Sequence, residues 1–299
     1  MRERRLPTYK KHPATGWVTA RDGDWADFEA ACRYKPSHDD IILMTYPKSG
    51  TTWVQHMLHL MVHNMTLVPE GRRLDSFAPF LEKGGLRLLS GLDRSPRPIK
   101  THLSFAVMPW SEVPRYVCVL RNAKDVCVSL FNHVRGFSSD YHFEDGEFAD
   151  FFDLFLGGDA NCGDYFDHLL SLWNRRFERN VLLLTYEGLI ADPVGGARLL
   201  VDHVRCSFPA DWREPDLEEL VAASNFDAMK AQCPDKWSSR RPEGAPAFIR
   251  KGVVGDWRNY LTPEQNERME RKFQHKLAGT GAEHLWPSEI GDPEQPGAP

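Results

Sequence analysis

The sequence lacks any apolar run that approaches the roughly 20 residues needed for a membrane-spanning helix. Its first residues, MRERRLPTYKKHPATGW, are basic, but no apolar stretch follows them. A secretory signal needs such a stretch directly after its basic region. We therefore expect a cytoplasmic protein with no membrane partner.

Cysteine motifs and excess positive charge are also missing. None of the six cysteines forms a C-x-x-C pair, which argues against a zinc site or a thioredoxin-like motif. Lys and Arg number 37 against 42 Asp and Glu, for a formal net charge of -5. Since nucleic-acid-binding domains are usually basic, no nucleic-acid partner is expected. The 299 residues suffice for one large α/β domain or two small domains.

What the chain does contain is an alternation of strand and helix patterns. Four short, nearly continuous apolar runs predict strands buried on both faces, at residues 41–46, 98–101, 116–120 and 181–185. Helical patterns lie between or beside them, at residues 51–64, 124–134 and 162–178. This order predicts a single α/β domain with a central parallel sheet flanked by helices. Ligands of such folds bind at the carboxyl ends of the strands.

The boundaries of that domain follow from composition. We expect residues 1 to about 20 to be weakly ordered and residues 21–286 to form the domain. Residues 287–299, PSEIGDPEQPGAP, are rich in Pro and Gly and are expected to form a flexible tail.

The first loop predicts an anion site. The string YPKSGTTW at residues 46–53 follows the first strand and opens a helix. A helix N-terminus binds anions through its backbone N–H groups and its dipole, and Lys48 adds a full charge. The usual nucleotide loop reads G-x-x-x-x-G-K-[ST], whereas here Lys48 precedes Gly50 and the first glycine is missing. The loop is thus a relative of the nucleotide-triphosphate loop with altered geometry.

Three further motifs follow in chain order. KTH at residues 100–102 ends the second strand, where a histidine is well placed to act as a base. RNAKDVCVS at residues 121–129 follows the third strand and begins with an arginine, which can bond phosphate oxygens bidentately. RKGVVGDW at residues 250–257 combines two cations with two glycines, as in a loop that closes on an anion.

These four motifs, in this order, resemble those of the cytosolic sulfotransferase family over about residues 39–286. The resemblance implies a P-loop-kinase-like fold. It also implies transfer of a sulfuryl group from 3'-phosphoadenosine 5'-phosphosulfate (PAPS) to a hydroxyl or amine of a small acceptor such as a phenol, alcohol or sterol. The coproduct is then adenosine 3',5'-bisphosphate (PAP). No metal is expected, since Lys and Arg supply the charge.

The resemblance also implies roles for individual residues. His102 is expected to be the catalytic base, Lys48 to stabilise the bridging oxygen, and Lys100 to assist the sulfuryl oxygens. The nucleotide is expected to contact Lys48, Ser49, Gly50, Thr51, Thr52, Trp53, Arg121, Ser129, Tyr186, Ser224, Phe226, Arg250, Lys251 and Gly252. The candidate acceptor contacts are Phe77, Phe80, Phe105, Phe137, Tyr141 and Phe143.

Two other patterns are given no catalytic role. His56, His59 and His63 share one face of the helix from Thr51 and are predicted to be its outward side, because apolar residues occupy the opposite face. Residues 258–267 align with the family's dimer motif K-x-x-x-T-V-x-x-x-E, but Arg258 replaces the Lys and Pro263 the Val. The homodimer therefore stays open, and Pro263 is expected at the first position of a helix.

Two other classes remain as alternatives. A nucleotide kinase would need Mg²⁺ held by an acidic residue at a strand end, whereas the second strand ends in Lys-Thr-His and the third in Arg. A non-catalytic binder that kept the fold would be recognised by the absence of turnover. The sequence does not identify the acceptor, because loops decide acceptor specificity and loops vary.

Overall fold

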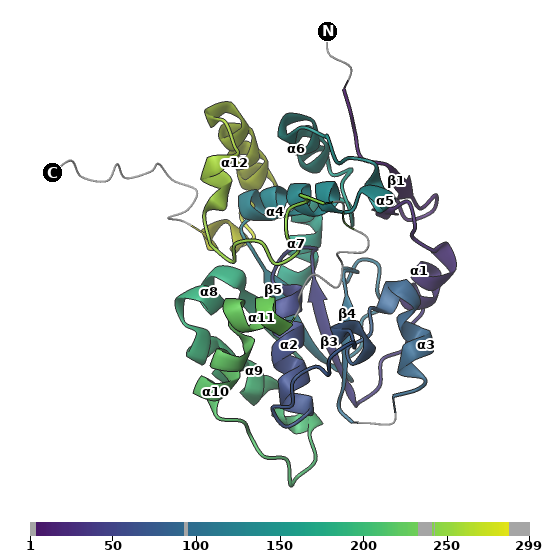
Figure 1. Ribbon diagram of the computed structural model, residues 1–299, viewed down its shortest axis with the longest axis vertical. Coiled ribbons are helices and arrows are strands. Elements are labelled where there is room, and N and C mark those ends of the chain that lie inside the picture. The colour runs from purple at the N-terminus through teal and green to yellow at the C-terminus, as the bar shows by residue number, and fades with distance from the viewer. Residues whose placement is uncertain (1–3, 93–94, 233–240, 242, 287–299) are drawn as a thin grey trace, which may run out of the picture.

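The computed structural model describes residues 4–92, 95–232, 241 and 243–286. Its centre is a four-stranded parallel sheet in the order β4-β3-β5-β6 (Figure 1). The strands are β3 (Asp40–Thr45), β4 (Arg97–Thr101), β5 (Arg115–Leu120) and β6 (Val181–Thr185). The predicted single-domain α/β fold with a parallel sheet is confirmed, and each predicted strand agrees with the observed one to within a residue at either end.

Helices cover both faces of the sheet, because successive side chains of a strand point to opposite faces. Ile41 and Leu43 of β3 point into one core cluster, which helices α2 (Thr51–Val62), α9 (Pro193–Val204) and α10 (Leu217–Ser224) complete. Ile42 and Met44 point into the other. That second cluster includes side chains of α1 (Trp25–Cys32), α4 (Ala123–Gly136), α6 (Phe148–Gly157), α7 (Tyr165–Trp173) and α12 (Pro263–Leu277).

Shorter helices connect these layers. They are α3 (Leu86–Leu89), α5 (Ser138–Tyr141), α8 (Tyr186–Ala191) and α11 (Phe226–Gln232). The helix predicted at residues 51–64 corresponds to α2, which ends two residues earlier, at Val62. The helix predicted at residues 124–134 corresponds to α4, which begins one residue before the predicted start. The third prediction, residues 162–178, was too long. Helix α7 begins only after Asp164, whose carboxylate accepts the N–H groups of Phe166 and Asp167 as an N-cap.

The N-terminal segment differs from the expectation of weak order. Strands β1 (Tyr9–Lys11) and β2 (Val18–Ala20) pair antiparallel as a small hairpin. Trp17 is buried and stacks on Phe28 of α1, with 5.6 Å between the ring centroids. The sequence did not indicate this hairpin, because two three-residue strands carry too little periodic pattern to be recognised.

The histidine face of α2 also differs from its prediction. His56 and His59 are buried, and His59 packs edge-on against Phe77 at 4.9 Å. Helix α2 contacts β3 and β4 on one side and α10 on the other, so both of its faces are covered. The prediction of an outward face was wrong, because the covering segments come from distant parts of the sequence.

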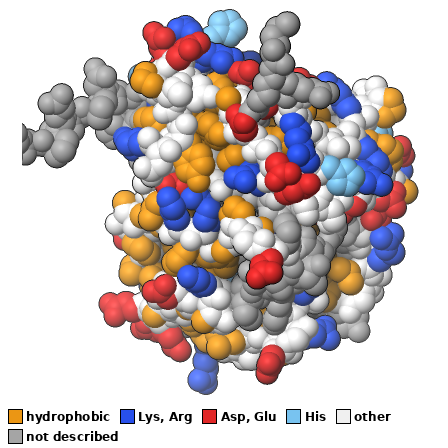
Figure 2. Space-filling model, turned by 45° about the horizontal axis from the view of Figure 1, so that its top comes forward, with side chains coloured by type: hydrophobic (Ala, Val, Ile, Leu, Met, Phe, Trp, Pro, Cys, Tyr) orange, Lys and Arg blue, Asp and Glu red, His pale blue; other side chains and the backbone are white. Residues whose placement is uncertain are grey.

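Helix α12 begins as predicted, with Thr262 as N-cap and Pro263 at the first helical position. Thr262 and Gln265 form a reciprocal capping box. The predicted tail, residues 287–299, lies outside the described residues. Among the residues that the structure describes, none of the helices combines the length and the apolar character needed to cross a membrane. The face shown in Figure 2 mixes Lys and Arg with Asp and Glu, with no large patch of one sign.

Candidate active site

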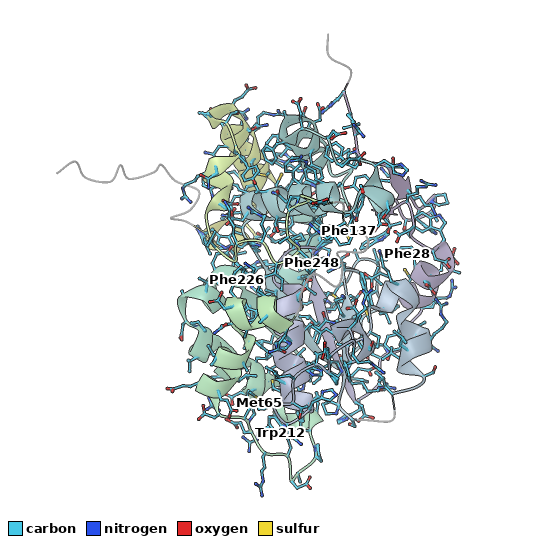
Figure 3. All side chains as sticks on the ribbon, in the orientation of Figure 1. Phe28, Met65, Phe137, Trp212, Phe226 and Phe248 are labelled. Carbon is cyan, nitrogen blue, oxygen red and sulfur yellow. The ribbon has the colours of Figure 1, made fainter. Side chains whose placement is uncertain are left out.

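The four strand ends open into one cavity. The loop after β3 leads into α2, His102 follows β4, Arg121 follows β5 and Tyr186 follows β6. Since parallel strands end at the same edge of a sheet, these residues come together there. The cavity has a volume of about 610 Å³. Phe226, Phe248, Phe137 and Phe28 all line it, and Figure 3 shows them following one another across the molecule.

The loop after β3 has the backbone of an anion site. Gly50 is the N-cap of α2 and has φ +98°, a conformation that favours glycine. A Cβ there would lie 2.9 Å from the Tyr186 ring, so the close approach of these two segments also requires glycine. Gly50 has no side chain to cap the helix, and the start of α2 therefore faces the cavity without a side-chain cap.

Lys48 places its ammonium group in this cavity, 4.4 Å from the centroid of the Phe248 ring. Burial, together with the charges of Arg121, Arg241 and Arg250, lowers the pKa of Lys48 to about 7. Neighbouring positive charges make the protonated form of Lys48 less stable. An anion bound in the cavity would stabilise that protonated form.

Arg121 connects three segments of the site. Its guanidinium donates to the carbonyl oxygens of Lys48 at 3.0 Å and Val253 at 3.2 Å. It also lies over the Tyr186 ring, 4.1 Å from the centroid. The Tyr165 hydroxyl donates to the carbonyl of Arg121 and holds the backbone behind it. The arginine is thus fixed where the strand ends meet.

The loop of residues 250–257 is held from two sides. Arg250 and Lys251 line the cavity, and both donate to the carboxylate of Asp256, at 2.5 Å and 2.6 Å. Burial opposes ionisation of Asp256, but the hydrogen bonds from Lys251, Asn259 and Arg250 outweigh it and lower its pKa to about 2.

The far end of this loop is fastened to α4. The carboxylate of Asp125 accepts the backbone N–H of Gly255 at 2.7 Å and that of Trp257 at 3.0 Å. Gly252 has φ +69°, and a Cβ there would lie 2.4 Å from the Phe226 ring. The loop therefore keeps two cations beside the phosphate loop in a defined backbone conformation.

His102 has a defined tautomer. Its Nδ1 lies 2.8 Å from the carbonyl oxygen of Thr45, which can only accept, so Nδ1 carries the proton and Nε2 carries the lone pair. Burial lowers the pKa of His102 to about 3, and the charge of Lys100 contributes in the same direction. A neutral imidazole with a free Nε2 is the form a general base requires.

Glu82 is buried beside His102 and was not predicted. Its carboxylate accepts the backbone N–H of His102 at 2.6 Å and the Thr101 hydroxyl at 2.8 Å. Burial raises the pKa of Glu82 to about 7, although these hydrogen bonds oppose the shift. The residue holds the turn after β4 in place. No pattern around residue 82 indicated this, because its partners lie about 20 positions away.

Lys100 is paired in this structure. Its ammonium lies 2.7 Å from a carboxylate oxygen of Asp75 and 4.5 Å from the centroid of the Phe80 ring. Burial would raise the pKa of Asp75, but the charge and the hydrogen bond of Lys100 lower it to about 2. Lys100 lines the cavity together with Asp75, so the pair forms one wall of the site.

The residues predicted for the adenine end are partly brought together. Trp53 and Tyr186 line the cavity edge to face, with 5.9 Å between centroids, and Phe226 lies on the same lining. Ser224 does not reach the cavity, because its buried hydroxyl donates to Leu220 of the same helix at 2.7 Å. Ser49 is also buried outside the lining, and its hydroxyl has no hydrogen-bond partner among the described residues.

Three of the six predicted acceptor contacts line the cavity, namely Phe80, Phe137 and Tyr141. The other three do not line the cavity. Phe77 packs on His59 and His63, Phe105 on Trp110 and Tyr116, and Phe143 on Phe131 and Phe151. An aromatic side chain in a loop gives no sequence signal of whether it points into a cavity or into a core.

Several lining residues were missed. They are Trp17, Trp25, Phe28, Lys83, His133 and Phe248. Trp17, Trp25 and Phe28 belong to the N-terminal hairpin and α1, which the sequence did not predict as parts of the site. Within the described ranges, no group of three or more His, Cys, Asp or Glu side chains could hold a metal ion.

The fold and the site together define an α/β protein with a parallel sheet and an anion loop after its first central strand. The model of the sulfotransferase domain family matches residues 38–281. The chain belongs to the sulfotransferase family. The predicted family and enzyme class are thereby confirmed.

Curated relatives agree along most of the chain. Rat sulfotransferase 1 family member D1 is 30% identical over 269 residues, which covers 85% of this chain and 87% of the relative. Human sulfotransferase 1C2 is 30% identical over 271 residues and covers 86% and 88%. Rat sulfotransferase 1A1 is 32% identical over 248 residues, with 79% and 83% covered.

Solved structures show the same fold at lower identity. Retinol dehydratase in complex with retinol and PAP matches with a TM-score of 0.75 and 22% identity, covering 91% of each chain. Mouse sulfotransferase SULT7A1 complexed with PAP matches with a TM-score of 0.70 and 24% identity, covering 93% of this chain and 96% of that one. The predicted P-loop-kinase-like architecture is thereby confirmed.

Proposed function

We propose that this chain transfers the sulfuryl group of PAPS to a hydroxyl or amine of a small acceptor, with His102 as general base. The observation that carries the proposal is the orientation of His102. Its Nδ1–H is committed to the Thr45 carbonyl, which leaves Nε2 as a hydrogen-bond acceptor in a residue that lines the cavity. Relatives of this chain named as sulfotransferases support the reaction class.

The residues at the strand ends fit an adenosine bisphosphate. A helix start without a side-chain cap and four cationic side chains, Lys48, Arg121, Arg250 and Lys251, line one end of the cavity. The Nε of Arg121 is buried without a hydrogen-bond partner among the described residues. Trp53, Tyr186 and Phe226 offer aromatic surface at the same end. We propose that the cations hold the phosphates and the aromatic side chains hold adenine.

When bound, PAPS supplies an activated sulfuryl group whose leaving group is the PAP phosphate. The chain's own residues then have separate tasks. His102 Nε2 takes the proton of the acceptor hydroxyl, a role worth about 10²–10⁴-fold in rate. Lys48 stabilises charge on the bridging oxygen, and Lys100 assists the sulfuryl oxygens. Arg121, Ser129, Arg250, Lys251 and the Gly252 backbone hold the 3'-phosphate. Positioning and charge stabilisation supply most of the catalysis.

Metal independence, a cytoplasmic location and the oligomeric state remain predictions. For metal independence, the cations already named support the proposal, because they supply the charge that Mg²⁺ supplies in kinases. The acceptor is a small molecule in this proposal. Two structural neighbours, both described as retinol dehydratase, are complexes with such molecules, androsterone in one and retinol in the other.

The test is a transfer assay with radiolabelled PAPS in the presence of EDTA, with a panel of phenols, aliphatic alcohols, sterols and amines. We expect labelled sulfate on at least one acceptor class and release of PAP. PAP alone should raise the melting temperature in EDTA, since a ligand at 100 times its Kd stabilises the fold by about 2.7 kcal/mol. If no acceptor is labelled and PAP does not shift the melting temperature, the proposal is disproved.

A further inference from the structure

The backbone of His102 is held by side chains from two other segments. Strand β4 lies at the edge of the sheet and ends at Thr101, one residue before His102. The carboxylate of Glu82 accepts the N–H of His102 at 2.6 Å. On the other side, the Nε2 of His168 lies 3.0 Å from the carbonyl oxygen of His102. Side chains therefore bond both polar backbone groups of the residue proposed as the base.

His168 is a buried residue of α7, 66 positions after His102 in the sequence. Only 3% of it is exposed, and it is not among the residues that line the cavity. A carbonyl oxygen can only accept a hydrogen bond, so the proton of His168 is on Nε2. Burial lowers the pKa of His168 to about 4, although its hydrogen bond to His102 opposes the shift. His168 is therefore a neutral donor near neutral pH.

The other ring nitrogen of His168 shows that an imidazole is costly at this position. The Nδ1 atom carries the lone pair and is buried without a hydrogen-bond partner among the described residues. A buried polar atom without a partner costs stability, and an apolar side chain of similar size would avoid that cost. What the imidazole provides in return is its bond to the carbonyl of His102.

Tyr46 holds the ring of His168 in turn. It meets His168 edge to face, with 5.4 Å between the centroids, and its hydroxyl donates to the carbonyl of Gly163 at 3.1 Å. Tyr46 directly follows Thr45, whose carbonyl accepts the Nδ1–H of His102. The end of β3, helix α7 and the turn after β4 are thus packed together around His102.

We propose that His168 is a positioning residue for sulfuryl transfer, which holds the carbonyl of His102 and so fixes the direction in which His102 Nε2 meets the acceptor hydroxyl. The inference rests on the proposed function, because it requires that His102 takes the proton. His168 exchanges no proton and contacts neither substrate. A general base acts only within hydrogen-bond reach of the proton, and a misplacement of about 1 Å can cost about 10²-fold in rate.

The first test replaces His168 with Leu, which has no donor. We expect kcat to fall by about 10–10²-fold, because His102 loses its alignment. The Kd of PAP, measured by calorimetry, should stay within a few-fold, because the proposed phosphate contacts are unchanged. His168→Gln places an amide N–H near the position of Nε2 and should restore most of kcat. His168→Asn is one bond shorter, places the amide near Nδ1 and should not restore it.

The matched control is His203→Leu. His203 on α9 makes the same kind of bond, with its Nε2 3.1 Å from the carbonyl oxygen of Tyr116. Tyr116 lies near the start of β5, at the opposite end of the strand from the cavity. His203→Leu should lower the melting temperature and leave kcat unchanged. An equal loss of kcat in His203→Leu and His168→Leu would overturn the inference, because a general loss of stability would then explain both.

A second test combines His168→Leu with His102→Ala. A residue that acts through His102 has nothing to position once the imidazole is gone, so His168→Leu should then change kcat by less than about twofold. If His168→Leu lowers kcat by the same factor with and without His102, its effect does not pass through the base, and the inference is wrong.

The outcomes separate the two proposals. Near-normal turnover of His102→Ala counts against the base named in the proposed function. Impaired turnover of His102→Ala together with normal turnover of His168→Leu overturns only the role of His168. If His168→Leu does not fold, His168→Gln and His168→Asn still decide the question, because equal kcat values for these two variants would overturn that role.

Discussion

At the scale of single residues, His102 and Lys48 carry the chemistry in different protonation states. His102 is neutral because it is buried, and its tautomer is set by the Thr45 carbonyl. Lys48 is held near the point at which it loses its proton, because it is buried among other cations. Both conditions come from the packing around the side chains, and each leads to a measurement.

The first prediction concerns His102. Replacing it with Ala should lower kcat by at least about 10²-fold, since that is the lower range for a general base. The Kd of PAP should stay within a few-fold, because the imidazole is not among the proposed phosphate contacts. The measurements are steady-state kinetics and calorimetric PAP binding. Near-normal turnover of His102→Ala would show that another group takes the proton.

The second prediction concerns Lys48. Its pKa is lowered to about 7 in the free protein, and a bound bisphosphate should raise it. At pH 8 the free side chain is mostly neutral, so PAP binding should take up a proton there. At pH 6 the side chain is charged in both states and should contribute no uptake. PAP affinity should therefore fall as the pH rises above about 7.

Calorimetry in two buffers measures that uptake. The observed binding enthalpy at pH 8 should differ between Tris and HEPES in proportion to their ionisation enthalpies. Lys48→Met should abolish the difference at pH 8. If wild-type protein binds PAP at pH 8 with no buffer dependence, Lys48 is already protonated and the lowered pKa is not its resting state.

At the scale of elements, the loop of residues 250–257 depends on anchors at both ends. Asp256 pairs with the two cations, and Asp125 on α4 accepts two backbone N–H groups at the far end. A loop held this way presents its cations without having to order them on binding, so less conformational entropy is lost. Asp256 lies within six residues of the cations that it pairs with. Asp125 is about 130 residues away in the sequence, and only the fold brings it to the loop.

The third prediction follows from that loop. Arg250→Ala combined with Lys251→Ala should remove the preference for PAPS over adenosine 5'-phosphosulfate, which lacks the 3'-phosphate. Two charge-assisted hydrogen bonds of about 1.5–3 kcal/mol each correspond to a preference of about 10²–10⁴-fold. The measurement is a pair of dissociation constants for each protein.

Arg258→Ala is the matched control. Arg258 is a cation of the same segment that stacks on Trp257 at 4.5 Å and does not line the cavity. The Arg258→Ala variant should keep the preference for PAPS over adenosine 5'-phosphosulfate. If the double variant weakens both nucleotides equally, residues 250–252 act on the 5' side or on folding, and the proposed 3'-phosphate site is wrong.

At the scale of the whole molecule, buried histidines link stability to pH. Burial lowers the pKa of His56, His102, His133, His168 and His203. Each of them binds its proton more readily in the unfolded state, near pH 6.5. Glu82 and Glu187 act in the opposite direction, because burial raises their pKa. The five histidines destabilise the folded state as the pH falls, and the two glutamates stabilise it. We therefore expect the folded state to lose stability in acid.

The fourth prediction is that the free energy of unfolding decreases as the pH falls from 6.5 towards about 4. Each uncompensated histidine contributes at most about 1.4 kcal/mol per pH unit. Urea unfolding at pH 7, 6 and 5 measures the slope, with far-UV circular dichroism as the probe. A stability that is constant or higher at pH 5 would show that these imidazoles are not kept neutral in the folded protein.

The sequence by itself determined the sheet and the phosphate end of the site. The four apolar runs predicted buried strands, and the motifs at residues 46–53, 100–102, 121–129 and 250–257 combine charged or titratable side chains with their position in the chain. Two of these motifs directly follow strands, and the motif at residues 100–102 spans the end of β4. Parallel strands end at one edge of the sheet, so local patterns were enough to bring their residues together.

Only the tertiary structure decided the acceptor end. Phe80 and Phe77 are three residues apart, yet Phe80 lines the cavity and Phe77 packs on the histidines of α2. His133 and Glu82 acquired their surroundings in the same way, from segments far away in the chain. The physical reason is that burial and direction of a side chain depend on everything packed around it, and neither leaves a local pattern in the sequence.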